Sequence, residues 1–135
     1  MSERPVGGEG LGYRYELAEL ERTTAASIQR EKSPEESLGL YQRAEEHWAA
    51  IIAAESHRGH WYHLRGKMRH QWATATYLTI SVTNGVLDTE HTRYAEFVRI
   101  WTLAYQDFTD AIRLSPLDRL PRQSFIKVHK NQRKE

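Results

Sequence analysis

The chain has 135 residues, the size of one domain with its own hydrophobic core. It contains no cysteine, which excludes thiolate catalysis, cysteine-based zinc sites and disulfide scaffolds. The net charge of +1 hides an uneven distribution: residues 1–117 carry 13 Lys and Arg against 16 Asp and Glu, whereas residues 118–135 carry 6 against 2.

Three segments are expected along the chain. Residues 1–10 are rich in glycine and lack the apolar stretch of a signal peptide, so we expect a flexible N-terminal segment. Residues 11–117 are expected to form one helical domain, and residues 118–135 a basic tail. No apolar stretch is long enough to span a bilayer, so we expect a cytoplasmic protein without a membrane partner.

The first two expected helices meet at a strong start signal. Ser33 can cap a helix, Pro34 fits its first turn, and Glu35 and Glu36 favour the positive end of the helix dipole. The first helix therefore covers about residues 11–32 and the second about residues 34–55. The face expected to be buried consists of Tyr13, Leu17, Leu20, Thr24 and Ile28 in the first helix, and of Leu38, Tyr41, Trp48, Ile51 and Ile52 in the second.

The third expected helix follows a short break at residues 56–59 and runs from about His60 to near Ser81. Its apolar face consists of Trp61, Leu64, Met68, Trp72, Ala75 and Leu78. The run Thr79–Thr83 favours a strand locally, which makes the end of this helix the weakest boundary. The pair Asn84-Gly85 tolerates a left-handed conformation and is expected to stop the helix.

The fourth expected helix begins at a cap on Asp88 or Thr89 and ends at Ser115-Pro116. Its apolar residues Tyr94, Val98, Trp101, Tyr105, Phe108 and Ile112 are separated by steps of three and four, which predicts one continuous buried stripe. Short connections place successive helices antiparallel. The expected fold class is therefore all-α, with four antiparallel helices arranged as a bundle or as helical hairpins.

Part of the fourth helix resembles a tetratricopeptide repeat. Ala104, Phe108, Ala111 and Pro116 match the small, aromatic, small and proline positions of the second repeat helix in that family. A partial match covers residues 44–64, where a second helix would pass into the aromatic-led first helix of another repeat. The fourth helix is longer than a repeat helix, and the two matches do not keep a uniform period. The resemblance implies stacked helical hairpins that bind other proteins.

No motif indicates catalysis or a cofactor. The chain has no P-loop, no nucleophile elbow and no dinucleotide-binding fingerprint after a strand. The histidines at positions 57, 60, 63 and 70 lack the spacing of a metal site, so neither a metal nor a cofactor is expected. The acidic pairs Glu45-Glu46 and Asp107/Asp110 are interpreted as solvated helix faces. We therefore expect a protein that is not an enzyme.

The third helix is basic, because no acidic residue occurs between Glu55 and Asp88. Its candidate contacts to an anion or a partner are Arg58, Tyr62, Arg65, Lys67 and Arg69. One interpretation is that these cations clamp phosphates while the aromatic ring stacks on a base. The other is that the arginines pair with the acid-rich first and second helices. Arg65 and Arg69 lie one turn apart and are expected to project together.

The tail combines a short apolar island with basic residues. Its candidate contacts are Phe125, Ile126, Lys127 and Lys130. The apolar pair can dock back on the helices or insert into a groove of a partner, with the lysines against an acidic surface. These features favour a non-catalytic adaptor or assembly subunit that binds another protein through a helical groove and the tail. The alternative is a nucleic-acid-binding accessory protein that uses the third helix and the tail.

Overall fold

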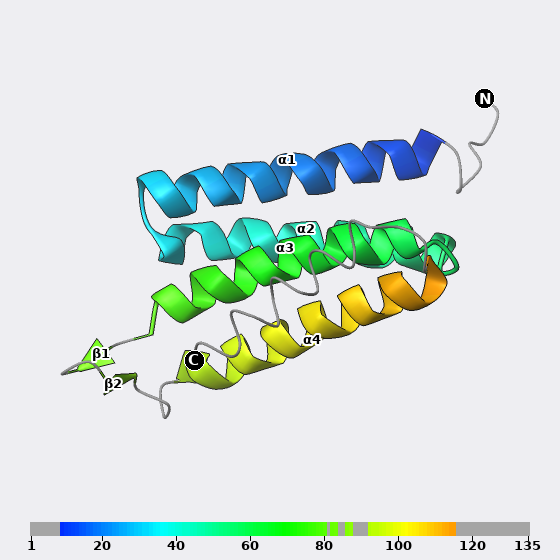
Figure 1. Ribbon diagram of the computed structural model, residues 1–135. Coiled ribbons are helices and arrows are strands. Elements are labelled where there is room, and N and C mark those ends of the chain that lie inside the picture. Colours follow the sequence, from blue (N-terminus) through cyan, green and yellow to red (C-terminus); the bar gives the residue numbers. More distant parts are fainter. Residues whose placement is uncertain (1–8, 81, 84–85, 88–91, 116–135) are drawn as a thin grey trace.

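The protein is all-α, as expected. The computed structural model describes residues 9–80, 82–83, 86–87 and 92–115, in which four helices follow one another: α1 (Glu9–Glu31), α2 (Pro34–Ala54), α3 (Gly59–Leu78) and α4 (Thr92–Leu114). Figure 1 shows the four helices lying roughly parallel or antiparallel, with α1 and α4 on opposite sides of the array. A short two-stranded ladder of β1 (Val82–Thr83) and β2 (Val86–Leu87) lies between α3 and α4 in the chain.

The helices form an open array of sequential hairpins. Within the described residues, α1 packs mainly on α2, α2 also packs on α3, and α3 packs on α4. The described parts of α1 and α4 do not contact each other, so the array does not close into a bundle in which the first and last helices meet. Of the two expected arrangements, the structure therefore has the helical hairpins.

The turn between α1 and α2 confirms the capping prediction. The Oγ atom of Ser33 accepts a hydrogen bond from the backbone N–H of Glu36 at 3.2 Å, and it donates to the Glu36 carboxylate. The first of these bonds satisfies one backbone N–H that a helix start leaves without a partner. The helix begins at Pro34, whose missing N–H costs nothing in the first turn.

The third helix ends earlier than predicted. It stops at Leu78, which is 55% exposed and was wrongly assigned to the buried face. The β-branched residues beyond it form a ladder instead, in which Val82 pairs with Leu87 and Thr83 with Val86 in antiparallel register. Ser81, the Asn84-Gly85 stop and the predicted caps Asp88 and Thr89 lie outside the described residues.

The buried face of α1 was also predicted wrongly. Tyr13 and Leu20 are 64% and 61% exposed, whereas Ala18 and Ala25 are completely buried. The partly buried Tyr15 and Arg22 lie on the same face as these alanines. Alanine buries little side-chain area, but its small size lets the backbones of α1 and α2 approach closely. This close packing outweighs the larger apolar area that Tyr13 and Leu20 offer.

In α4 the buried face is rotated relative to the predicted stripe. Val98 is 42% exposed, and the residues at the centre of the buried face are Phe97, Ile100, Ala104, Phe108 and Ala111. Against this face lies Gly66 of α3, where an added Cβ atom would lie 2.8 Å from the Phe108 ring. The ring fills the space that the glycine leaves, so the small residues of both helices set how closely and at what rotation they pack.

The predicted core of α2 is confirmed except at Leu38, which is only partly buried. Tyr41, Trp48, Ile51 and Ile52 are buried, as are Met68, Trp72 and Ala75 of α3. The rings of Trp48 and Tyr15 meet edge to face, with centroids 5.9 Å apart. Since α2 contacts both α1 and α3, its aromatic and aliphatic residues hold the two hairpins together.

Candidate binding surface

Two arginines of the basic third helix converge on one carboxylate. Arg65 donates two hydrogen bonds to the Asp107 carboxylate of α4, at 3.0 and 2.8 Å. Arg69 donates to the same carboxylate at 3.0 Å and forms a second, two-bonded ion pair with Glu45 of α2, at 2.9 and 2.6 Å. Arg65 and Arg69 thus project together as expected, and the second interpretation, intramolecular pairing, describes their side chains. Their main partner is on α4, which sequence reasoning did not consider.

Asp107 is not part of a solvated face, which corrects its interpretation from the sequence. Its exposed fraction is 1%, because α4 turns it toward α3. Burial raises the pKa of the Asp107 carboxyl, while the hydrogen bonds and charges of Arg65 and Arg69 oppose that shift. The two cations and the two carboxylates of the cluster balance in charge. The cluster therefore connects α2, α3 and α4 without leaving a net charge inside.

Arg58 and Tyr62, at the start of α3, make local contacts. The Arg58 guanidinium forms an ion pair with Glu55 at 3.1 Å and lies over the Trp61 ring, 4.9 Å from its centroid. The Trp61 indole N–H donates to Glu55 at 2.7 Å, which lowers the pKa of that carboxyl. The Tyr62 hydroxyl donates to the backbone carbonyl of Ser56 at 3.0 Å. These contacts close the turn between α2 and α3.

The remaining predicted contact residues are not brought together with the arginines. Lys67 is exposed on α3. The tail residues Phe125, Ile126, Lys127 and Lys130 lie outside the described residues. The predicted basic surface therefore reduces, within the part that the structure describes, to Lys67 and the exposed guanidinium of Arg58.

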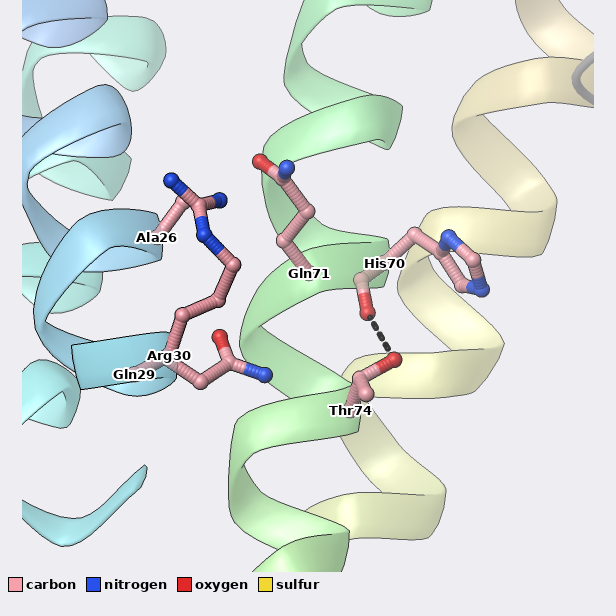
Figure 2. Close-up of a pocket in the computed structure, with 6 residues that line it drawn as sticks. All are labelled: Ala26, Gln29, Arg30, His70, Gln71 and Thr74. Carbon is pink, nitrogen blue, oxygen red and sulfur yellow. Dashed lines mark hydrogen bonds between the residues drawn. The ribbon is translucent and has the colours of Figure 1, made fainter. Parts of the chain in front are cut away.

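A pocket that the sequence did not reveal lies between α1 and α3. It has a volume of about 230 Å³ and is lined by three residues of each helix: Ala26, Gln29, Arg30, His70, Gln71 and Thr74. Figure 2 shows the Arg30 guanidinium and the amides of Gln29 and Gln71 on the two sides of the gap. We call this feature the α1/α3 pocket. It exists because α1 and α3 both pack on α2 but touch each other only sparsely.

One polar contact connects α1 to α3 beside the pocket. Arg22 of α1 donates to the Gln71 side-chain oxygen at 3.0 Å and is itself held by two bonds to Glu19, at 2.9 and 3.0 Å. Further along the helices, the rings of Tyr15 and Trp61 meet with centroids 5.8 Å apart. These contacts fix the spacing of the two helices on one side of the pocket.

Sequence reasoning missed the pocket for a physical reason. A glutamine in a sequence does not by itself indicate a binding site. The role of Gln29 and Gln71 depends on the distance between α1 and α3, which are far apart in the sequence. The one available signal was Arg30, which is exposed in the last turn of α1.

The described residues offer neither a metal site nor a membrane-spanning helix. No group of three or more His, Asp or Glu side chains is arranged there to hold a metal ion. None of the described helices combines the length and apolar character that a membrane span requires. Comparison of the chain with protein-family models, with curated proteins and with solved structures gives no match.

Proposed function

We propose that this protein is a non-catalytic adaptor or assembly subunit that binds another protein between α1 and α3, with its basic tail as a second contact. The observation that carries the proposal is the open array, which leaves a pocket with several polar side chains in its walls between two helices instead of a closed core. A pocket of this kind is accessible to a side chain of a partner, whereas the arginines of α3 are engaged inside the protein.

The resemblance to tetratricopeptide repeats supports this reading. Ala44, Trp48 and Ile51 are buried in the second helix of the first hairpin. Ala104, Phe108 and Ala111 are buried at the same relative positions in the second helix of the second hairpin. Each set has a small residue, an aromatic residue four positions later, and an apolar residue three positions after that. We therefore propose tetratricopeptide-like packing within both hairpins.

Binding of nucleic acid is the weaker candidate. A nucleic-acid surface needs several cations that are available to phosphates. Arg58, Arg65 and Arg69 each form an ion pair with a carboxylate of this chain. Recruiting them would leave Asp107 or Glu45 with fewer partners, which is costly for a buried carboxylate.

The proposal is tested by filling the α1/α3 pocket. Tagged protein is expressed in the cells of origin as the natural sequence, as the double variant Ala26→Leu with Thr74→Leu, and as the control Ala53→Leu. Ala53 is exposed on α2 and does not line the pocket. Captured proteins are quantified by mass spectrometry. We expect a partner that the natural protein and the control retain in equal amounts and that the pocket-filled variant loses; identical partners for all three proteins would contradict the proposal.

A second experiment tests the alternative, which is nucleic-acid binding. Fluorescence anisotropy with labelled single- and double-stranded DNA and RNA is measured over a series of salt concentrations, for the full chain and for a chain ending at Leu117. Affinity that falls linearly on a double-logarithmic salt plot would make nucleic acid the partner. We expect no binding at physiological salt.

A further inference from the structure

The α1/α3 pocket is too small for a whole cofactor. Its volume of about 230 Å³ lies below the range of about 300–1,000 Å³ in which drug-sized ligands and cofactors bind. It has room for one side chain or one small group. The chemistry of its walls therefore decides which group fits.

The orientation of the Gln71 amide is fixed by its neighbour. Arg22 donates to the Gln71 Oε1 atom at 3.0 Å, and a guanidinium cannot accept a hydrogen bond, so the oxygen must face Arg22. Arg22 is in turn held by Glu19, which raises the pKa of its guanidinium. The NH₂ group of Gln71 is left to donate to a ligand.

Gln29, across the pocket, is oriented in the same way. The Tyr41 hydroxyl donates to the Gln29 Oε1 atom at 2.8 Å. Burial raises the pKa of Tyr41 to about 12, so the hydroxyl keeps its proton at neutral pH and remains the donor. The NH₂ group of Gln29 is therefore also a donor that a ligand can use. Both amides have their oxygens occupied and their donors available.

Arg30 supplies a cation whose charge is not compensated within the described residues. It is exposed in the last turn of α1, and no described carboxylate forms an ion pair with it. No Asp or Glu is among the residues that line the pocket. The Thr74 hydroxyl donates to the His70 carbonyl at 3.0 Å, and Figure 2 shows the His70 ring turned toward α4, where it meets Trp101. The pocket thus presents donors and one positive charge.

We infer that the α1/α3 pocket binds the carboxylate of an Asp or Glu side chain in an acidic segment of the partner protein, an inference that rests on the proposed function. A carboxylate carries one negative charge, which one arginine compensates, and its two oxygens accept from the guanidinium and from the amides. A phosphate carries nearly two charges and would be only half compensated. The pocket is partly open to the surface, so the chain that carries the carboxylate can continue outside it.

The test follows the two glutamine side chains by nuclear magnetic resonance. The full chain is labelled with ¹⁵N, and its side-chain amide signals are recorded while a blocked ten-residue polyglutamate peptide is added. The variants are Arg30→Met, which keeps the length of the side chain without its charge, and Arg99→Met as the control. Arg99 is exposed on α4, away from the pocket.

The expected result is a saturable shift of the amide signals of Gln29 and Gln71. Arg30→Met should weaken polyglutamate binding by about tenfold, the effect of one charge-assisted hydrogen bond. Arg99→Met should leave the affinity unchanged, and a neutral Gly-Ser peptide of the same length should give no shift. Backbone signals outside the pocket must stay in place, which shows that each variant is folded.

Three outcomes would overturn the inference. The first is the absence of a shift at Gln29 and Gln71. An equal loss of polyglutamate affinity in both arginine variants would count in the same way, because the peptide would then respond to the overall charge of the protein and not to the pocket. The second is tighter binding of inorganic phosphate than of polyglutamate. The third is that free glutarate binds as tightly as the peptide, which would make a small acid the ligand.

Failure of this inference and failure of the proposed function are distinguishable. If a partner is lost when the pocket is filled but still binds the Arg30→Met variant, the adaptor function is supported and the carboxylate site is contradicted. If polyglutamate binding depends on Arg30 but no partner is lost when the pocket is filled, the carboxylate site is supported and the adaptor function is contradicted.

Discussion

At the scale of single residues, Asp107 holds the side chains of Arg65 and Arg69 in the interior. Within the described part of the chain, Arg65 forms its ion pair with Asp107 alone. Arg69 forms ion pairs with both Asp107 and Glu45. A buried pair is not by itself a large gain in stability, but removing one partner leaves the other charged and desolvated. Removing the Asp107 carboxylate should therefore cost more stability than the intact ion pairs contribute.

We predict that Asp107→Asn lowers the free energy of unfolding by about 3–5 kcal/mol, because Arg65 and Arg69 would remain buried beside a neutral amide. The matched control is Asp110→Asn, one turn further on α4, where the contact to Arg113 is 3.5 Å long and lies at the surface. Its cost should stay below about 1 kcal/mol. Urea unfolding of the three proteins measures both values, and equal costs for the two variants would contradict this account of the cluster.

Tyr41 gives a prediction that depends on pH. The pKa of its buried hydroxyl is raised from 10.0 to about 12, so in this pH interval the unfolded chain loses the proton while the folded chain keeps it. The folded state then binds more protons, and stability falls as the pH rises. At neutral pH, Tyr41→Phe should cost about 1 kcal/mol for the lost hydrogen bond to Gln29.

Near pH 11 the natural protein should have lost about 1 kcal/mol that the phenylalanine variant does not lose. The difference between the two proteins should therefore close between pH 8 and pH 11. Denaturation at several pH values measures it, and the other tyrosines and lysines cancel because both proteins carry them. A difference that stays constant over this range would show that the hydroxyl is not protected from ionisation.

Among single residues, the sequence predicted those whose partners lie nearby in the chain and missed those whose partners lie on other helices. The Ser33 cap was predictable because its partners lie within four residues. The burial of Asp107 was not, because it depends on the rotation of α4 against α3. The donors of Gln29 and Gln71 were hidden for the same reason, since their orientation is set by Tyr41 and Arg22 from other turns of the structure.

At the scale of elements, glycine and alanine positions decide how the helices pack. Gly66 faces the ring of Phe108 across the α3–α4 contact, and Gly39 on α2 faces open space. Both lie inside helices, so both carry the same intrinsic cost of glycine in a helix. Packing requires a glycine at position 66 but not at position 39.

We predict opposite effects of two identical substitutions. Gly39→Ala should stabilise the protein by about 0.5–1 kcal/mol, because helix propensity improves and no atom is displaced. Gly66→Ala should destabilise it by about 1–2 kcal/mol, because the new methyl group collides with a buried ring and the cost exceeds the gain in propensity. Thermal and urea unfolding measure both; a gain at Gly66 would mean that α3 and α4 are not held at this distance.

The helices themselves were largely predictable, and so was the buried face of α2, but the buried faces of α1 and α4 were not. The number of helices and most of their ends follow from caps and periodicity, which are local. The buried faces of α1 and α4 were misjudged because large apolar residues such as Tyr13 and Val98 were given more weight than Ala18 and Ala104. In this protein the small residues mark the contact. The strand pair after α3 had a signal in its β-branched residues, which was read only as a weakness of the helix end.

At the scale of the whole molecule, the open array places the core around α2 and leaves the space between α1 and α3 only partly filled. The contacts of α2 with α1 and α3 bury the aromatic core, and the cluster around Asp107 joins α2, α3 and α4. Because α1 meets α3 only at isolated points, the α1/α3 pocket remains between them. We consider this space, and not the basic face of α3, to be the recognition surface.

The most direct test of this claim is to place a photoreactive amino acid at Thr74, inside the α1/α3 pocket, and separately at Val98, on the exposed side of α4. The yield of protein–protein crosslinks in living cells is then compared after illumination. The account predicts one defined adduct from position 74 that is absent from position 98, and a reduced yield from position 74 when Arg30→Met is added. Equal adducts from both positions, or adducts from position 98 alone, would contradict it.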